Sequence, residues 1–217
     1  MRPLPRRAKG RGSDLCPIMS KLIVVVGSTG VGKTALVQAL CKKGLFVAGL
    51  EEHNKRPFQR LFKTNARFAL ANQLDYLLLR AEQERLLRLL PQTGLMDGGL
   101  ELDFHGFTRL FHLRAMLSDA EFDLCKRFYE LVRTHQPPPD LVINLTASPE
   151  VIARRLATRK RVNVADAGDI SQLDTFIGEW LSTLRPDHLL HLDVSEDDFG
   201  YRKLLPSLLK TLRPLSR

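Results

Sequence analysis

The residues with the clearest chemical meaning form one short segment near the start of the chain. The segment fits the pattern G-x-x-x-x-G-K-[ST] and lies between an apolar run and a stretch of helical spacing. Glycines let successive backbone N–H groups turn toward phosphates, which the lysine neutralises, while the threonine hydroxyl is a ligand for Mg²⁺. We therefore expect this segment to bind ATP with Mg²⁺. Its residues are Gly27, Ser28, Thr29, Gly30, Val31, Gly32, Lys33 and Thr34.

The elements that must position this segment alternate along the chain. Short apolar runs predict buried strands at 21–27, 45–51, 94–99 and 188–194, with another inside 137–159. Helical spacing is found at 33–44, 65–90, 104–116, 119–135 and 201–212. This order predicts an α/β fold of the P-loop NTPase type, a three-layer sandwich with a parallel sheet of about five strands and helices on both faces.

Three further segments between these elements carry weaker signals. Pro57 indicates a loop after the second strand, and residues 160–170 lack periodicity and predict a mobile loop. A short helix is expected to end in the sequence GEWL, which contains Trp180.

Composition bounds the organisation of the chain. With 217 residues and 44% hydrophobic content, residues 21–217 are expected to form one domain. Residues 1–20 are rich in Pro, Gly and Arg and carry much of the net charge of +9, so we expect a disordered extension. An extension without function is favoured over a targeting segment or a nucleic-acid-binding arm, and nucleic acid is not an expected partner.

The cysteines and the apolar runs indicate the compartment. Cys16, Cys41 and Cys125 form neither a disulfide framework nor a zinc site, which suits a reducing environment. No apolar run approaches the roughly 20 residues of a membrane span. We therefore expect a cytoplasmic protein with no membrane partner.

Three stretches in their order along the chain, 51–80, 97–107 and 149–161, resemble the deoxynucleoside kinase family. The similarity runs from about Lys21 to Leu212. Members of this family transfer the γ-phosphate of ATP to the 5′-hydroxyl of a deoxynucleoside in nucleotide salvage. The resemblance implies the same reaction here and a homodimer, for which the apolar helices at 68–90 and 119–133 offer an interface.

The resemblance assigns the acceptor side of the site. Glu51 falls on the family's general base, which takes the proton of a sugar hydroxyl, and Glu52 is the alternative if the register slips by one. Gln73 and Arg80 lie seven residues apart and so share a helix face, where they match residues that hold the base. Asp103 matches the acid that pairs with this arginine.

The resemblance also assigns the donor side. The stretch 153–161 looks like the family's lid, placed at about 155–170, whose arginines stabilise the charge of phosphoryl transfer. The stretch 192–199 resembles the loop beside the adenine, with one residue too many. The residues assigned on this side are Arg155, Arg159, Arg161, Glu196 and Asp197.

The third-strand motif departs from the family pattern. The family has an acid followed by Arg and Ser, whereas this chain has Asp97-Gly98-Gly99. Asp97 is expected to serve Mg²⁺ or the 5′-hydroxyl, but the arginine beside the acceptor oxygen is missing. Candidates for a replacement charge are Lys55, Arg56 and Lys160.

A second departure concerns the sugar. Phe62 stands where the family has a tyrosine that contacts the 3′-oxygen, and no acid follows Arg161 before Asp166. These departures keep two other functions open. One is a nucleoside monophosphate kinase such as thymidylate kinase, and the other is a catalytically impaired relative that binds nucleotides.

Overall fold

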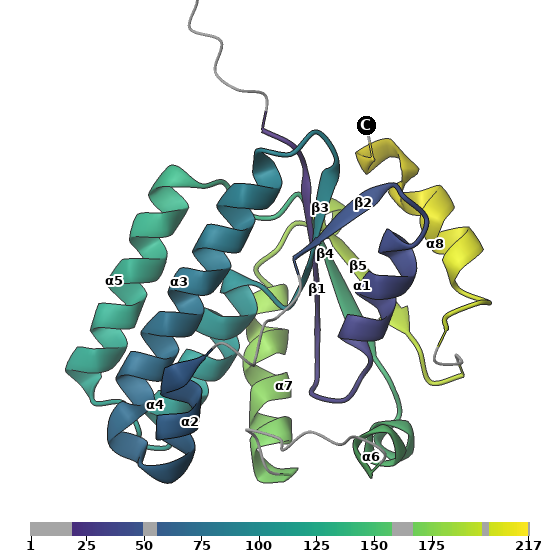
Figure 1. Ribbon diagram of the computed structural model, residues 1–217. Coiled ribbons are helices and arrows are strands. Elements are labelled where there is room, and N and C mark those ends of the chain that lie inside the picture. Colours follow the sequence, from purple (N-terminus) through teal and green to yellow (C-terminus); the bar gives the residue numbers. More distant parts are fainter. Residues whose placement is uncertain (1–18, 50–55, 158–166, 197–199, 217) are drawn as a thin grey trace, which may run out of the picture.

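A five-stranded parallel sheet forms the centre of the protein in the computed structural model (Figure 1). The structure describes residues 19–49, 56–157, 167–196 and 200–216. The strand order is β2-β3-β1-β4-β5, so the first strand is central. The strands are β1 (Leu22–Gly27), β2 (Phe46–Gly49), β3 (Thr93–Asp97), β4 (Leu141–Thr146) and β5 (Leu189–Asp193).

The central strand shows why its sequence is apolar throughout. Ile23 and Val25 point into the core on one face of the sheet, and Leu22, Val24 and Val26 point into the core on the other. Every residue of β1 is buried. A strand that is covered on both faces needs apolar side chains at every position, as the run at 21–27 predicted.

The helices cover both faces of the sheet (Figure 1). Leu36 on α1 and Leu208 on α8 belong to the core on one face, and Leu87 on α3 and Ile177 on α7 belong to the core on the other. The helices are α1 (Lys33–Cys41), α2 (Pro57–Thr64), α3 (Ala69–Arg88), α4 (Arg109–Leu113), α5 (Asp119–His135), α6 (Pro149–Ala157), α7 (Ala167–Leu181) and α8 (Leu205–Leu212). The predicted α/β sandwich is confirmed.

Shorter helical turns complete the chain. Single 3-10 turns lie at Ala66–Phe68, Pro186–His188 and Arg213–Leu215. A π-helix, Leu102–Thr108, leads directly into α4. Helical segments of this type are rare and are often found at functional sites.

The structure corrects two local predictions. Pro57 begins α2 rather than marking a loop, because the fixed φ of proline suits the first turn of a helix, where its missing N–H costs nothing. The predicted loop at 160–170 overlaps α7, which begins at Ala167. The remainder of that loop, 160–166, lies outside the described residues.

Candidate active site

The phosphate segment connects the carboxyl end of β1 to α1. Gly27, Gly30 and Gly32 have φ angles of +132°, +89° and +110°, which L-residues rarely adopt, so the glycines are needed for this turn. The Lys33 ammonium donates to the carbonyl oxygens of Gly27 at 2.8 Å and Ser28 at 2.9 Å. These two bonds hold the Lys33 ammonium against the backbone of the predicted loop, where it can contact a bound anion.

Two side chains from distant parts of the chain fix the same loop from behind. The Arg155 guanidinium donates through Nη1 to the carbonyl of Val31 at 2.5 Å and through Nη2 to that of Val194 at 3.1 Å. The Tyr201 hydroxyl donates to the carbonyl of Gly32 at 3.0 Å. A Cβ on Gly32 would lie only 2.1 Å from the tyrosine oxygen, so glycine and tyrosine fit together closely.

Tyr201 was missed in the sequence, and its backbone marks it as unusual. The residue is 1% exposed and has a φ of +52°, a left-handed conformation that costs a non-glycine residue about 1–3 kcal/mol. Such strain persists only where the surroundings hold it. A tyrosine between Gly200 and Arg202 gives no sequence signal for this role.

Thr34 and Asp97, both predicted for Mg²⁺, lie together. The Thr34 hydroxyl donates to Oδ2 of Asp97, which is 5% exposed and pairs with Val25 in the sheet register. Hydroxyl and carboxylate oxygens are the hard ligands that Mg²⁺ prefers. The pair therefore fits a magnesium ion that is shared with a bound triphosphate.

Asp174 is a second site residue that the sequence did not reveal. It lies on α7, and its Oδ1 accepts a hydrogen bond from the Ser28 hydroxyl at 2.5 Å. Desolvation of the carboxyl raises the pKa of Asp174, while the Ser28 hydrogen bond and the charge of Lys33 oppose the shift. The one available signal was an acid among the apolar positions of a helix, between Leu173 and Ile177.

The three predicted base-side residues form one buried network. Arg80 Nε donates to Asp103 Oδ2 at 2.8 Å, and these side chains are 3% and 8% exposed. The Gln73 amide nitrogen donates to the backbone carbonyl of Asp103 at 2.9 Å and to the Thr108 hydroxyl at 2.8 Å. The π-helix places both Asp103 and Thr108 toward α3, so it builds this network together with that helix.

A charged cluster behind this network holds its helices together. Arg133 on α5 donates to both carboxylate oxygens of Glu84 on α3, at 3.1 and 2.9 Å, and to Glu101 beside the π-helix at 2.9 Å. Burial raises the pKa of Glu101, and the charge of Arg133 opposes that shift. The cluster fixes the position of α3 and the π-helix, on which Gln73 and Asp103 lie.

His105 lies on the same π-helix in an aromatic environment. Its ring stacks on Trp180, with centroids 5.6 Å apart, and its Nε2 is 3.2 Å from the Tyr129 hydroxyl. Burial, together with the charges of Arg109 and Arg133, lowers the pKa of His105 to about 4. The ring is therefore neutral at neutral pH.

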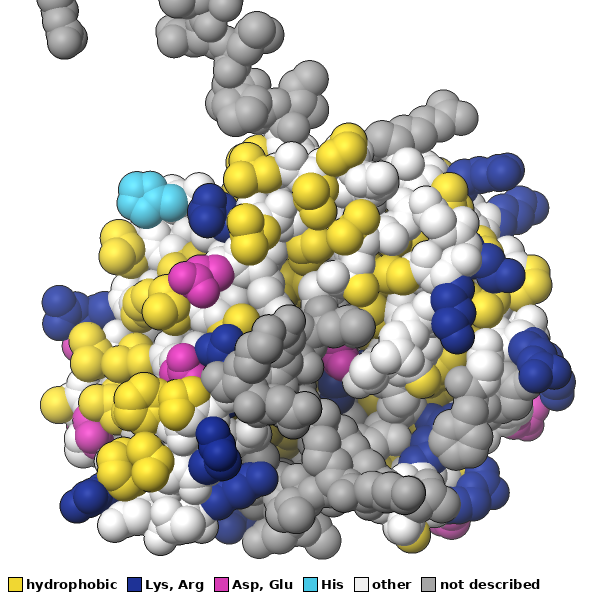
Figure 2. All heavy atoms as spheres, in the orientation of Figure 1, with side chains coloured by type: hydrophobic (Ala, Val, Ile, Leu, Met, Phe, Trp, Pro, Cys, Tyr) yellow, Lys and Arg dark blue, Asp and Glu magenta, His cyan; other side chains and the backbone are white. Residues whose placement is uncertain are grey.

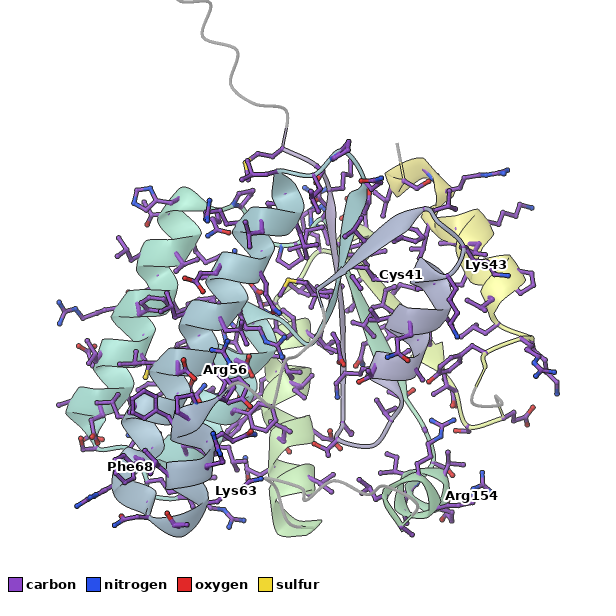
Figure 3. All side chains as sticks on the ribbon, in the orientation of Figure 1. Cys41, Lys43, Arg56, Lys63, Phe68 and Arg154 are labelled. Atoms are coloured by element: carbon purple, nitrogen blue, oxygen red, sulfur yellow. The ribbon has the colours of Figure 1, made fainter. Side chains whose placement is uncertain are left out.

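Phe62 and Arg56 lie at the edge of this half. The Phe62 ring is 5.1 Å from that of Phe111, so the stacking surface predicted for the sugar side is part of an apolar cluster. Arg56, a candidate for the missing charge, instead donates to Asp75 on α3 at 3.0 Å (Figure 3). It thereby joins the start of α2 to α3.

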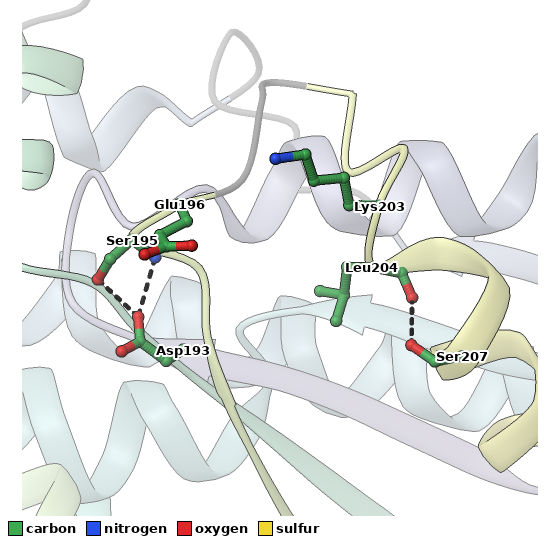
Figure 4. A pocket seen from close by; sticks show the side chains of 6 residues that line it. All are labelled: Asp193, Ser195, Glu196, Lys203, Leu204 and Ser207. Carbon is green, nitrogen blue, oxygen red and sulfur yellow. Dashed lines mark hydrogen bonds between the residues drawn. The ribbon is translucent and has the colours of Figure 1, made fainter.

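A shallow pocket lies on the donor side, between the end of β5 and the start of α8 (Figure 4). The Ser195 hydroxyl donates to Asp193 at 2.6 Å and holds the turn that carries Glu196. Glu196 lines this pocket, and its predicted role beside the adenine stays a prediction. The lining residues are Asp193, Ser195, Glu196, Lys203, Leu204 and Ser207.

Some predicted residues lie outside the described residues. The general base and its alternative belong to this group, together with two lid arginines and one acid of the adenine-side loop. They are Glu51, Glu52, Arg159, Arg161 and Asp197. Lys55 and Lys160, suggested as replacement charges, also belong to it.

Among the described residues, no group of three or more His, Cys, Asp or Glu side chains is placed to hold a metal ion. Within the same ranges, no helix has the length and apolar character needed to cross a membrane.

Comparison with known proteins identifies the family of this chain. A sequence profile of the family described as deoxynucleoside kinase matches residues 23–204. The chain belongs to the deoxynucleoside kinase family and is a kinase of that class. This confirms the resemblance found in the sequence.

Two curated relatives share a low sequence identity with this chain. A deoxyadenosine/deoxycytidine kinase of Bacillus subtilis (strain 168) is 22% identical over 184 residues, which cover 82% of this chain and 85% of that protein. A deoxyadenosine kinase of Dictyostelium discoideum is 25% identical over 140 residues, covering 64% of this chain and 57% of that protein.

Solved structures confirm the fold. A deoxyadenosine kinase from M. mycoides superimposes with a TM-score of 0.72 in structures with bound dCTP and with bound dATP. The identities are 18% and 19%, and the matches cover 88% and 87% of this chain and 99% of the neighbour in both cases. At these identities the likeness supports the fold alone.

Proposed function

We propose that this enzyme transfers the γ-phosphate of ATP to the 5′-hydroxyl of a deoxynucleoside. The observation that carries the proposal is the meeting of two halves at the carboxyl ends of β1 and β3. The phosphate loop with Lys33 and Thr34 forms one half, and the buried network of Gln73, Arg80 and Asp103 forms the other. Asp97 lies between them at the end of β3.

The proposed reaction needs one proton acceptor and several positive charges. The 5′-oxygen forms a bond to the γ-phosphorus while the bond to the bridging oxygen breaks, and ADP leaves with the electron pair. In our proposal, Glu51 takes the hydroxyl proton, and Lys33, Arg159 and Arg161 neutralise the charge on the phosphoryl oxygens. Thr34 and Asp97 hold Mg²⁺, which neutralises charge on the phosphates of ATP.

The direction of the Gln73 amide supports a preference among bases. Its nitrogen already donates to Asp103 and Thr108, so we assign its oxygen to the base. An amide oxygen accepts from the exocyclic amino groups of adenine and cytosine, whereas thymine presents a carbonyl at the corresponding place. The two sequence relatives carry deoxyadenosine or deoxycytidine in their names, which agrees with this choice.

The test is ADP release from Mg·ATP in the presence of single acceptors. The panel contains the four deoxynucleosides, their ribonucleoside counterparts and their monophosphates, with Lys33→Ala as the blank. We expect turnover with deoxyadenosine and deoxycytidine and much less with thymidine. Preferred turnover of a monophosphate would instead indicate a monophosphate kinase, and ATP binding without transfer to any acceptor would indicate an impaired relative.

The same assay tests recognition of the sugar by comparing a 2′,3′-dideoxynucleoside with the corresponding deoxynucleoside. Phe62 has no hydroxyl for the 3′-oxygen, so we expect a 2′,3′-dideoxynucleoside to be phosphorylated nearly as well as its deoxynucleoside. A large loss with the dideoxynucleoside would show that another group reads the 3′-hydroxyl.

We also propose a homodimer in the cytoplasm. Exposed leucines gather on α3 and α5, where Leu86 and Leu131 are 54% and 58% exposed, and Figure 2 shows hydrophobic side chains on the side that carries these helices in Figure 1. Apolar surface of this kind favours association. Sedimentation should give a dimer for the wild type and a monomer for Leu86→Glu with Leu131→Glu, while Leu45→Glu on the other side of the sheet should leave the dimer intact.

A further inference from the structure

The Arg80 guanidinium extends beyond the base-side network toward the end of β3. Its Nε donates to Asp103 at 2.8 Å and its Nη1 donates to Gln83 at 3.2 Å. Its Nη2 lies over Gly98, because a Cβ built on that glycine would be 3.1 Å from Nη2. The guanidinium therefore occupies the space that a side chain at position 98 would need.

Gly98 is part of the site at which the phosphate loop and β3 meet. Its N–H donates to the carbonyl of Val25 at 2.9 Å, two residues before the phosphate loop begins. The preceding residue, Asp97, accepts the hydrogen bond of Thr34. A positive charge over Gly98 is thus next to the residues that are proposed to hold Mg²⁺ and the triphosphate.

We infer that Arg80 places its charge at the reaction centre and contacts the acceptor 5′-oxygen or the transferred phosphoryl group. This inference rests on the function proposed above. Phosphoryl transfer spreads negative charge over oxygens that a fixed cation stabilises. Arg80 is suited to this because it stays protonated, is 3% exposed and is held by Asp103. It gives and takes no proton in the step.

The geometry also explains the glycine at position 98. Gly98 has a φ of +84°, and any Cβ there would press on Nη2, which the bond from Nε to Asp103 prevents from moving freely. With Arg80 in its present position, a side chain at position 98 would crowd Nη2 at the end of β3. In this chain Arg80 on α3 provides the cation, and Gly98 after β3 leaves space for its guanidinium.

The chain offers a matched pair of glycines for the test. Gly98→Ala adds a methyl group against Arg80, whereas Gly44→Ala adds one where φ is +76° and no atom lies within 4 Å. Both glycines have a positive φ of similar size, and Gly44 precedes β2, at the amino end of the sheet, whereas Gly98 follows the carboxyl end of β3. The difference between the two variants therefore reports the contact with Arg80.

The measurement is kcat and KM for ADP release with each accepted deoxynucleoside, together with the melting temperature of each variant. We expect Gly98→Ala to lower kcat about tenfold or more, since losing one transition-state donor costs ~10²–10³ in rate. Gly44→Ala should keep the wild-type kcat at a similar melting temperature. Arg80→Lys keeps the charge but loses the planar guanidinium with its several N–H donors. It should lower kcat by the same factor for every base.

Two results would overturn the inference. An active wild type whose Gly98→Ala and Arg80→Lys variants change only KM, or change kcat by factors that differ among bases, would restrict Arg80 to base recognition. A wild type without acceptor-dependent turnover would overturn the proposed function and this inference together, before any variant is compared.

Discussion

The two halves of the site differ in the bonds that fix their central residues, although the side-chain pairs Ser28–Asp174 and Thr34–Asp97 also occur on the phosphate side. On the phosphate side, the side chains of Lys33, Arg155 and Tyr201 all donate to backbone carbonyls of the loop. On the acceptor side, Arg80 and Asp103 bind each other through their side chains, and the Gln73 amide is fixed by a side chain and a carbonyl.

This difference matches what each half must recognise. A loop whose shape is fixed through its backbone presents N–H groups to an anion. Such a loop recognises the negative charge of the triphosphate, whichever base the nucleotide carries. A network of paired side chains presents particular donors and acceptors, and it rejects a ligand that leaves them unpaired. Under the proposed function, we therefore expect specificity to depend on side-chain identity in the acceptor half and on the backbone conformation of the loop in the phosphate half.

The largest effect is expected from Asp103→Ala. It leaves the Arg80 charge buried without its carboxylate, and breaking a buried pair in this way costs about 3–5 kcal/mol of unfolding free energy. The check is urea denaturation. At temperatures well below unfolding, ATP binding measured by calorimetry should stay close to the wild-type value, because the hydrogen bonds that shape the phosphate loop do not involve this pair.

A matched control is Asp187→Ala. It removes an arginine–aspartate pair of nearly the same length, 2.7 Å, that is exposed to solvent. We expect little change in the urea midpoint, since surface pairs contribute little. Equal losses in the two variants would mean that burial does not distinguish the acceptor-side pair.

A smaller effect is expected from acid, through His105. Its pKa is lowered to about 4 in the folded protein, while the unfolded chain takes up the proton near the ordinary value of 6.5. Unfolding therefore binds a proton between these values, so this contribution to stability is complete above pH 6.5 and is lost as the pH falls toward 4. The loss amounts to about 3 kcal/mol.

His105→Phe isolates that contribution. Between pH 7 and pH 4 the free energy of unfolding should fall by about 3 kcal/mol more in the wild type than in the variant, because phenylalanine has no proton to bind. If the stability of both proteins fell equally with pH, His105 would not be held neutral in the folded protein. The sensitivity to acid would then come from other titratable groups.

The smallest effect is expected from Tyr201→Phe in the phosphate half. The substitution removes one hydrogen bond to the carbonyl of Gly32, worth about 1 kcal/mol, so KM for ATP should rise roughly fivefold. KM for the nucleoside should not change. Steady-state kinetics with each substrate varied in turn gives both values.

Thr93→Val is the comparison for this variant. Thr93 is 2% exposed, and its hydroxyl also donates to a backbone carbonyl, that of Leu215, but at the amino end of β3. It should leave both KM values unchanged. If it raised KM for ATP as much as Tyr201→Phe does, general loosening of the fold would explain the result.

The sequence was most informative where local pattern and chemistry coincide. The phosphate loop was readable because glycines, lysine and threonine must stand at fixed spacing between a strand and a helix. Gln73, Arg80 and Asp103 were found through a family resemblance, and the structure brings them together as that resemblance implied. Their roles toward substrate stay predictions.

Other features depended on contacts that no local pattern encodes. Asp174 and Tyr201 reach the phosphate loop from segments more than 140 residues away, so spacing along the chain could not reveal them. The π-helix has no distinct periodicity in a stretch as short as 102–108. Pro57 was ambiguous because proline suits both a loop and the first turn of a helix.

The bond between Tyr201 and Gly32 joins residues 169 positions apart, and this separation has a consequence for synthesis. A ribosome that adds 5–20 residues per second makes the phosphate loop roughly 10 to 30 s before the tyrosine that supports it. Arg155 also follows the loop, by 124 positions from Val31. The nucleotide motif is thus made well before the residues that support it, and its support is completed only after Tyr201 has left the ribosome.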